Sequence, residues 1–381
     1  MTARGRRRAT LADSAIAARR VLGAAGHATL APGAPAAGGD LILGGGGFLD
    51  PADGRTQHFA FVRVDVPGRR VGLTPTTFLP HGVAVDPLDA HRVVAFEKIG
   101  PGCAEIDLAS GRVTRGIRPA EGRWFYGHGA FSADGRLLYS TETVNARESG
   151  VIGVRDAKTL AYLGEFPTHG ENPHDCRLID GGRVMVVTNG GGALGTDMRP
   201  CVTYVEVETR RRLEKQELSS DRFNTGHLAL GGPDALVIVS APRKGLTDRE
   251  PGAVSLRRGR ERLRTMTEPA AVAARMLGEA LSVEIHEPSG VAAVTHPTGG
   301  MVTFWSLADF TLVKVLDLPR PRGLALTRDG RRFLLSFGES AELVEVDPQT
   351  LELRPDTALH QSFLTGSHLF NWNRLSAASE H

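Results

Sequence analysis

The sequence predicts an all-β protein, a seven-bladed β-propeller made of four-stranded blades. Short runs rich in β-branched residues, bounded by turn residues, fill the chain from Gly39 onward, and one pattern of runs returns about every 46 residues. Each run is too short for a helix, and Asp-Gly and Gly-Gly pairs mark tight hairpin turns. Four-stranded units of this length are typical of propeller blades, which bury their faces against their neighbours.

The repeat is clearest where a histidine opens the first run of a unit. Such histidines are His81, His128, His174 and His227, separated by 47, 46 and 53 residues. Two further units carry Leu281 and Arg322 at the same position, and His368 follows Arg322 by 46 residues. The last unit lacks its remaining strands, which we expect from the runs at 40–50 and 58–66. A ring closed by both termini leaves no open sheet edge.

One segment breaks the β pattern. The stretch "TEPAAVAARMLGEAL" (267–281) begins with an acidic residue and a proline and continues with strong helix formers. We therefore expect one helix inserted near residues 268–281.

The composition is that of a globular protein with a large core. The 381 residues include 41% hydrophobic and 23% charged residues, and the formal net charge is only +2. This balance gives no electrostatic basis for binding nucleic acid or an anionic membrane. No stretch approaches the ~18 apolar residues of a membrane-spanning helix. We expect a monomer without a membrane span and without a nucleic-acid partner.

The three cysteines predict neither a disulfide framework nor a zinc ribbon. Cys103, Cys176 and Cys201 are odd in number and form no CxxC pair. We expect buried free thiols, with a single disulfide bridge as the alternative.

The N-terminal region has the outline of an export signal. An arginine cluster is followed by an alanine-rich segment that ends in small residues, as in twin-arginine signals. Two arginines and an aspartate interrupt the apolar part, which makes the signal degenerate. We therefore expect a signal-like or disordered segment at 1–39, one propeller domain at 40–375 and a tail at 376–381.

The repeated position should bring histidines together. The first strand of each propeller blade lines the central channel, so residues that open this strand lie at one channel mouth. Five of the seven positions are histidine in a chain with 13 histidines. Imidazole nitrogen suits a borderline transition metal such as iron, copper or zinc, so we predict a metal site. The predicted ligands are His81, His128, His174, His227 and His368.

Other polar residues should return to the same mouth. The second strand runs antiparallel to the first and ends at the same face. Supporting or alternative ligands predicted from this position are Glu97, Glu142 and His296. Residues expected beside the ligands, or in contact with an anion, are Arg123, Arg322, Asn189 and His169.

Several functions are compatible with this pattern. The first is a metal-binding protein, and the second is a metal-dependent oxidase, lyase or lactonase with an open metal position. A third is a protein-interaction scaffold without metal, since polar channel residues commonly satisfy one another and water. Protonated histidines could instead bind an anion or an organic acid. The chain contains no nucleophile elbow, phosphate-binding loop or HExxH motif.

The same residues resemble an uncharacterised family of bacterial propeller proteins. The similar stretches are "RWFYGHGAFSADGRLLYSTE" (123–142), "GVIGVRDAKTLAYLGEFPTHGENPHDCRL" (150–178), "VMVVTNGG" (184–191), "GHLAL" (226–230) and "VAAVTHPTGG" (291–300). Members usually carry twin-arginine export signals, and their genes often lie beside those of imelysin-like proteins linked to periplasmic iron uptake. The resemblance, over roughly residues 75–345, implies a periplasmic location, an iron or other metal context and iron-uptake proteins as partners. It implies no reaction. We therefore expect a protein of metal acquisition or handling, with iron favoured over copper or zinc.

Overall fold

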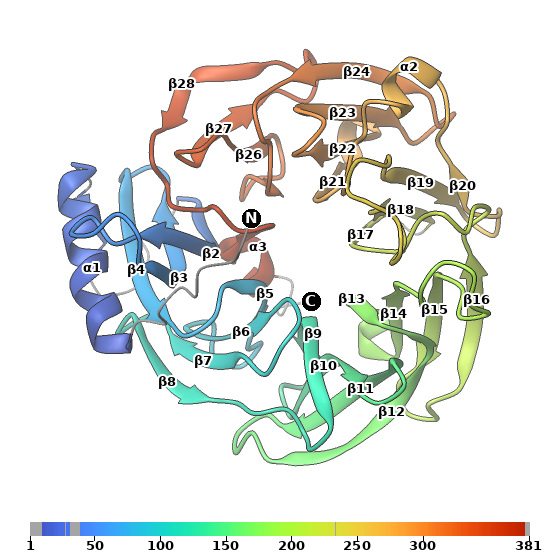
Figure 1. Ribbon diagram of the computed structural model, residues 1–381, viewed down its shortest axis with the longest axis horizontal. Helices are drawn as coiled ribbons and strands as arrows, with labels where there is room; N and C mark the ends of the chain where they lie inside the picture. Colours follow the sequence, from blue (N-terminus) through green and yellow to red (C-terminus); the bar gives the residue numbers. More distant parts are fainter. Residues whose placement is uncertain (1–9, 27, 31–38, 233, 378–381) are drawn as a thin grey trace.

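Seven antiparallel sheets stand around a central axis in the computed structural model, which confirms the predicted propeller (Figure 1). The structure describes residues 10–26, 28–30, 39–232 and 234–377. Six blades are continuous in sequence, and each runs outward from the axis in strand order.

The blades are numbered along the chain. Blade 1 comprises β5 (Pro80–Val85), β6 (Arg92–Glu97), β7 (Cys103–Asp107) and β8 (Arg112–Gly116). Blade 2 comprises β9 (Arg123–Phe131), β10 (Leu137–Val144), β11 (Ser149–Asp156) and β12 (Tyr162–Glu171). Blade 3 comprises β13 (Pro173–Ile179), β14 (Val184–Asn189), β15 (Cys201–Glu206) and β16 (Arg212–Glu217).

The next three blades have the same order. Blade 4 comprises β17 (Leu228–Gly231), β18 (Ala235–Ser240), β19 (Ala253–Arg258) and β20 (Arg264–Thr265). Blade 5 comprises β21 (Val283–His286), β22 (Val291–His296), β23 (Met301–Ser306) and β24 (Leu312–Asp317). Blade 6 comprises β25 (Leu324–Leu326), β26 (Phe333–Phe337), β27 (Glu342–Val346) and β28 (Leu353–Leu359).

Blade 7 closes the ring with strands from both ends of the chain, as predicted. Its strands, from the axis outward, are β29 (Leu369–Asn371), β2 (Leu41–Leu49), β3 (Gln57–Asp65) and β4 (Arg70–Thr76), with the short β1 (Ala28–Thr29) parallel to β4. β29 and β2 are antiparallel and pair Gly44 with Leu369. This pairing joins residues more than 300 positions apart. It gives blade 7 its inner strand and leaves no open sheet edge there.

The blades are held together by apolar contacts between neighbouring sheets. Every residue of β14 is buried, whereas exposed residues alternate along the outer strand β16. One core cluster joins Tyr139 and Phe166 of blade 2 to Met185 and Val205 of blade 3. An inner strand is therefore covered on both faces by the adjacent blades, which explains its continuous apolar run.

Helix α1 (Leu11–Ala24) lies along the outside of blade 7 (Figure 1). Thr10 and Asp13 form a capping box at its start, and the Ser14 hydroxyl lies 2.9 Å from Nδ1 of the buried His58. This helix differs from the disorder expected at 1–39, because its small buried residues fit against the sheet. Of the signal-like segment, residues 1–9, 27 and 31–38 lie outside the described residues, as do residues 378–381 of the expected tail.

The helix expected near 268–281 is only one turn long, α2 (Ala270–Ala273). Residues beyond it bond to neighbouring loops in place of continuing the helix, since Met276 O accepts from Gly252 N and Gly278 N donates to Glu250 O. Met276 is thereby buried in the core of blades 4 and 5. The segment is thus a loop that leads to the channel mouth.

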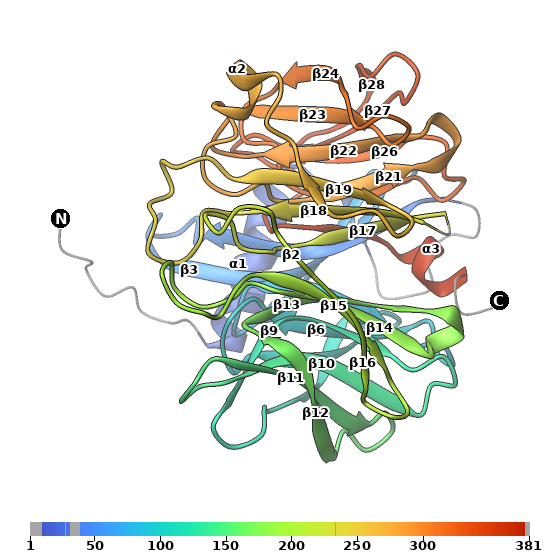
Figure 2. The ribbon, with the colours of Figure 1, turned by 90° about the vertical axis from the view of Figure 1, so that its right-hand side faces the viewer.

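The remaining helices are short. They are η1 (Asp180–Gly182), η2 (Glu287–Ser289) and α3 (Trp372–Ala377), which projects from one face of the ring in the side view (Figure 2). Within the described ranges, no helix is both long and apolar enough to cross a membrane. The three cysteines are buried free thiols, as predicted.

Candidate metal centre

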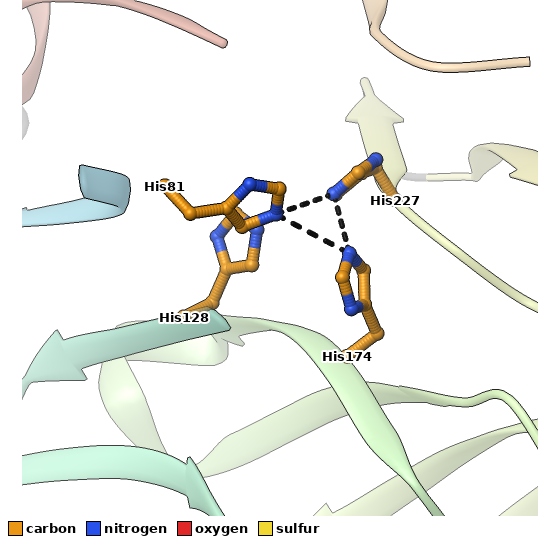
Figure 3. A group of neighbouring side chains, drawn as sticks. All are labelled: His81, His128, His174 and His227. Atoms are coloured by element: carbon orange, nitrogen blue, oxygen red, sulfur yellow. Dashed lines mark hydrogen bonds between the residues drawn. The ribbon is translucent and has the colours of Figure 1, made fainter. Parts of the chain in front are cut away.

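Histidines from four consecutive blades point toward one another at the axis (Figure 3). His81 lies on β5, His128 on β9 and His174 on β13, and His227 immediately precedes β17. One nitrogen from each ring lies within 4.8 Å of the others, a grouping that could hold a metal ion. The predicted convergence of these four residues is therefore present in the structure.

His368 of blade 7 adjoins this group. Its Nε2 lies 2.8 Å from Nε2 of His227, and its ring centroid lies 4.6 Å from that of His81. The five rings, here called the histidine cluster, are His81, His128, His174, His227 and His368. Each is at most 8% exposed.

Glycines allow these rings to approach. Gly127, which precedes His128, has φ 118°, and a Cβ there would lie 3.0 Å from Cδ2 of His81. A Cβ on Gly82 would lie 2.3 Å from the carbonyl oxygen of Gly127. A side chain at Gly82 would collide with this backbone, and Gly127 has a backbone conformation that favours glycine. The glycine next to His128 is thus explained by close packing of two inner strands.

The tautomer of His227 is set by a backbone contact. Its Nδ1 lies 2.6 Å from the carbonyl oxygen of Leu281. A carbonyl only accepts, so Nδ1 carries the proton and Nε2 of the neutral ring carries a lone pair. This nitrogen faces the other histidines.

The contacts around His227 cannot all be hydrogen bonds. Its Nε2 lies 2.6 Å from Nε2 of His174 and 3.1 Å from Nε2 of His81, and these two are 3.4 Å apart. Each nitrogen either donates or accepts, so among three mutually close ones at least two have the same state. A single cation would satisfy several lone pairs at once. The geometry therefore fits a metal ion better than a network of hydrogen bonds.

His128 has a carboxylate beside it that the sequence analysis missed. Its Nδ1 lies 3.4 Å from Oδ1 of Asp175, while its Nε2 is buried without a partner among the described residues. A carboxylate on the far nitrogen of a ligating histidine orients the ring and strengthens it as a ligand. Asp175 directly follows His174 and is itself fully buried. The sequence position of Asp175 does not indicate that it lies beside His128, because the contact joins two different blades, from β13 to β9.

Burial keeps the histidine cluster neutral. It is the largest cause that lowers the pKa of all five rings well below the usual range. The positive charge of Lys98 adds to this effect on every ring except His227. Burial also raises the pKa of Asp175, against the opposing influence of Arg177. Neutral imidazole is the form that binds a metal, so the cluster needs no deprotonation near pH 7.

The two predicted carboxylates do not join the histidine cluster. Oε2 of Glu97 accepts a hydrogen bond from Gly102 N within its own hairpin. Glu142 is fully buried and paired with Arg155 at 2.6 Å. Both stand at the end of a second strand, as expected, but Glu142 pairs along the blade with β11 and not across the channel.

His296 and Asn189 also bond within their blades. Nε2 of His296 lies 2.9 Å from Thr303 Oγ1, and the Asn189 amide donates to Thr203 Oγ1. In both cases the partner is on the third strand of the same blade. The side chain at the end of the second strand therefore lies along its own sheet and does not point into the channel. The expectation that second-strand ends supply ligands is therefore not met in these blades.

The remaining predicted residues are dispersed. Arg123 pairs with Glu165, and His169 is half-buried with its Nε2 3.3 Å from the carbonyl of Arg210. Arg322 is closer to the site, since its Nε donates to the Gly366 carbonyl, two residues before His368. It therefore holds the segment that carries a histidine.

Two cavities reach the histidine cluster. One of about 160 Å³ lies at the predicted channel mouth and touches His174 and His227. The other, about 930 Å³, follows the inner strands away from the mouth and touches His227 and His368. A metal held by the cluster would thus lie between two routes to solvent.

The comparisons with solved structures agree with the fold. Hydrazine synthase of Kuenenia stuttgartiensis aligns with a TM-score of 0.59 at 13% identity, over 79% of this chain and 94% of that one. "Dihydro-heme d1 dehydrogenase NirN in complex with DHE" aligns with a TM-score of 0.54 at 15% identity, over 88% of this chain and 69% of that one. At such identities the likeness shows the fold alone.

The family comparison covers most of the propeller. No curated protein matches the sequence. The family described as "Protein of unknown function (DUF1513)" matches residues 76–369, from just before β5 to the start of β29. That range holds the whole histidine cluster, and the chain belongs to this family.

Proposed function

We propose that this protein binds a transition-metal ion, iron by preference, through the histidine cluster. The observation that carries the proposal is the set of converging Nε2 atoms, whose short mutual distances cannot all be hydrogen bonds. His81, His128, His174 and His227 would be the ligands, with His368 completing or exchanging with one of them.

The donor set supports a borderline metal. Imidazole nitrogen suits iron, copper and zinc, whereas magnesium and calcium prefer oxygen ligands. Zinc in proteins is usually four-coordinate, and five rings close to one point favour a metal that accepts a higher coordination number. Iron is therefore favoured, with copper and zinc as alternatives.

The setting we propose is periplasmic metal acquisition or handling. This part of the proposal rests on the sequence resemblance, which implies export and a context of iron uptake. Iron-uptake proteins of the periplasm would then be the partners. The location is tested by fractionating cells that express the full chain.

A metal-dependent enzyme is the second candidate. It is favoured by the cavity of about 160 Å³ that touches two of the proposed ligands, since a catalytic metal needs an open position next to a substrate site. When bound, the metal would supply a Lewis-acid or redox centre. The described residues would orient the metal and shield it from bulk water.

Metal analysis of the purified full chain tests the proposal. Protein stripped with a chelator and then exposed to Fe(II) without oxygen, or to Cu(II) or Zn(II), should retain about one ion per chain after gel filtration. His174→Ala combined with His227→Ala should abolish retention, because both rings face the same point.

The matched control is His169→Ala, which changes a half-buried histidine on the outer strand of blade 2, outside the histidine cluster. It should retain metal like the unchanged protein, and circular dichroism should show intact strands in all variants. Retention below about 0.1 ion per chain for every metal, by folded protein, would contradict the proposal and leave a scaffold without metal.

A further inference from the structure

The cavity at the channel mouth carries several polar side chains and is close to the histidine cluster. Besides His174 and His227, its lining includes Lys98, Tyr126 and Glu279. Its volume of about 160 Å³ admits a ligand of few non-hydrogen atoms. A ligand in this cavity would contact two of the proposed metal ligands.

An ion pair spans this mouth. Nζ of Lys98, after β6 in blade 1, lies 3.2 Å from Oε2 of Glu279, in the loop that leads to blade 5. Lys98 lines the same cavity as His174 and His227 of the cluster. The cation is therefore near the histidines, while its counterion is supplied from a distant part of the chain.

The Lys98–Glu279 pair is exposed and therefore exchangeable. The two side chains are 43% and 36% exposed. Exposed ion pairs contribute little to stability, because water screens them and two long side chains lose freedom. An incoming carboxylate can replace Glu279 on Lys98 without disturbing the core.

Tyr126 supplies a neutral donor to the same cavity. Its ring centroid lies 6.2 Å from that of His174, and its hydroxyl has no hydrogen-bond partner among the described residues. A phenol hydroxyl donates a hydrogen bond, so Tyr126 can donate to an oxygen atom of a ligand in the cavity.

We propose that this cavity binds a small anion, a monocarboxylate or an oxyanion of similar size, which replaces Glu279 on Lys98 and accepts from Tyr126. The inference rests on the proposed function, because the metal supplies the attraction at the inner end. Neutral imidazoles leave the charge of a bound metal uncompensated, and an anion compensates it. Lys244 also lines the cavity, but its partner Glu148 accepts a further hydrogen bond from the Asn172 amide, which holds that pair together. Lys98 is therefore the cation that the anion would use.

Azide binding to the cobalt(II)-loaded protein tests this inference. Azide should change the visible absorption of the cobalt, and acetate should compete with it. Lys98→Met should weaken azide binding at least about tenfold, and Glu279→Gln should strengthen it several-fold, because it frees Lys98. Tyr126→Phe should weaken azide binding by a smaller factor, since a neutral donor is lost.

The matched control is Arg374→Met, which removes a cation that lines the larger cavity on the other side of the cluster. It should leave azide binding unchanged. An unaltered azide affinity in both Lys98→Met and Glu279→Gln would overturn the inference, as would a loss confined to Arg374→Met. Cobalt content is measured in every sample. Failure to bind cobalt would contradict the proposed function, whereas failure of cobalt-loaded protein to bind azide would contradict only this inference.

Discussion

Two sectors of the ring use the same repeat position differently. Five consecutive blades, from blade 7 through blade 4, carry a histidine at the repeat position of the inner strand, whereas blades 5 and 6 have Leu281 and Arg322 there. The Leu281 carbonyl accepts from Nδ1 of His227, and Arg322 holds Gly366, two residues before His368. The two blades without histidine thus position the histidines at both borders of the cluster.

This difference separates the proposed ligands from residues that orient them. A repeated backbone brings seven residues to one mouth, but seven imidazoles would exceed what one metal ion can coordinate. Five supply nitrogen, and the other two positions supply a carbonyl and a guanidinium that contact the border histidines. The comparison predicts that changes in the two sectors differ in size.

The largest difference should appear in the pH dependence of the metal-free protein. The pKa of each ring is lowered in the folded protein, whereas in the unfolded chain it is about 6.5. Below that pH the unfolded chain binds more protons than the folded protein. The free energy of unfolding therefore falls as the pH falls through about 6.5. Each of the five should cost about 1.4 kcal/mol between pH 7.5 and 5.5. Urea unfolding at both pH values measures the total.

A substitution within the cluster sharpens that comparison. His81→Leu with His128→Leu gives two blades the residue that blade 5 has, and should flatten the pH dependence by about two fifths. An unchanged slope would show that these rings do not titrate on unfolding as their burial requires.

An intermediate effect is expected for Asp175→Asn. The substitution preserves volume but removes the charge beside Nδ1 of His128, so metal affinity should fall by about 10- to 100-fold. Competition with a fluorescent chelator measures the affinity. Glu142→Gln is the control, because its carboxylate pairs with Arg155 outside the cluster. Equal losses of affinity in the two variants would mean that Asp175 acts only on the fold.

The smallest effect is expected for Arg322→Met, in the sector without histidine. It frees the Gly366 carbonyl and loosens the segment of His368, so metal affinity should fall by less than about tenfold. Arg123→Met, which breaks a pair with Glu165 near the outer strand of blade 2, should leave the affinity unchanged. A loss as large as that of Asp175→Asn would make His368 a principal ligand.

Features that depend on interactions between residues close in the sequence could be predicted, and features that depend on contacts between distant residues could not. The strands and the hairpins between them come from local patterns, and the closing of blade 7 follows from counting repeats. The helix at 267–281 was predicted from the same local propensities and is wrong beyond Ala273, because bonds from Gly252 and Glu250 compete with the helix. Local propensity does not contain such contacts.

The second-strand residues show the same limit. Glu142 and His296 were placed correctly at the end of their strands, yet each side chain bonds to the third strand. A period along the chain places a backbone position, but it does not say which of two faces a bulged or twisted strand end presents.

The sequence by itself determined the seven-bladed ring and the convergence of His81, His128, His174 and His227, because a repeat places equivalent residues at equivalent points around an axis. Only the tertiary structure decided that Leu281 sets the tautomer of His227, that Asp175 stands beside His128 and that Lys98 meets Glu279 across the mouth. These contacts join different blades and depend on distances of a few ångströms, which no period along one chain can specify.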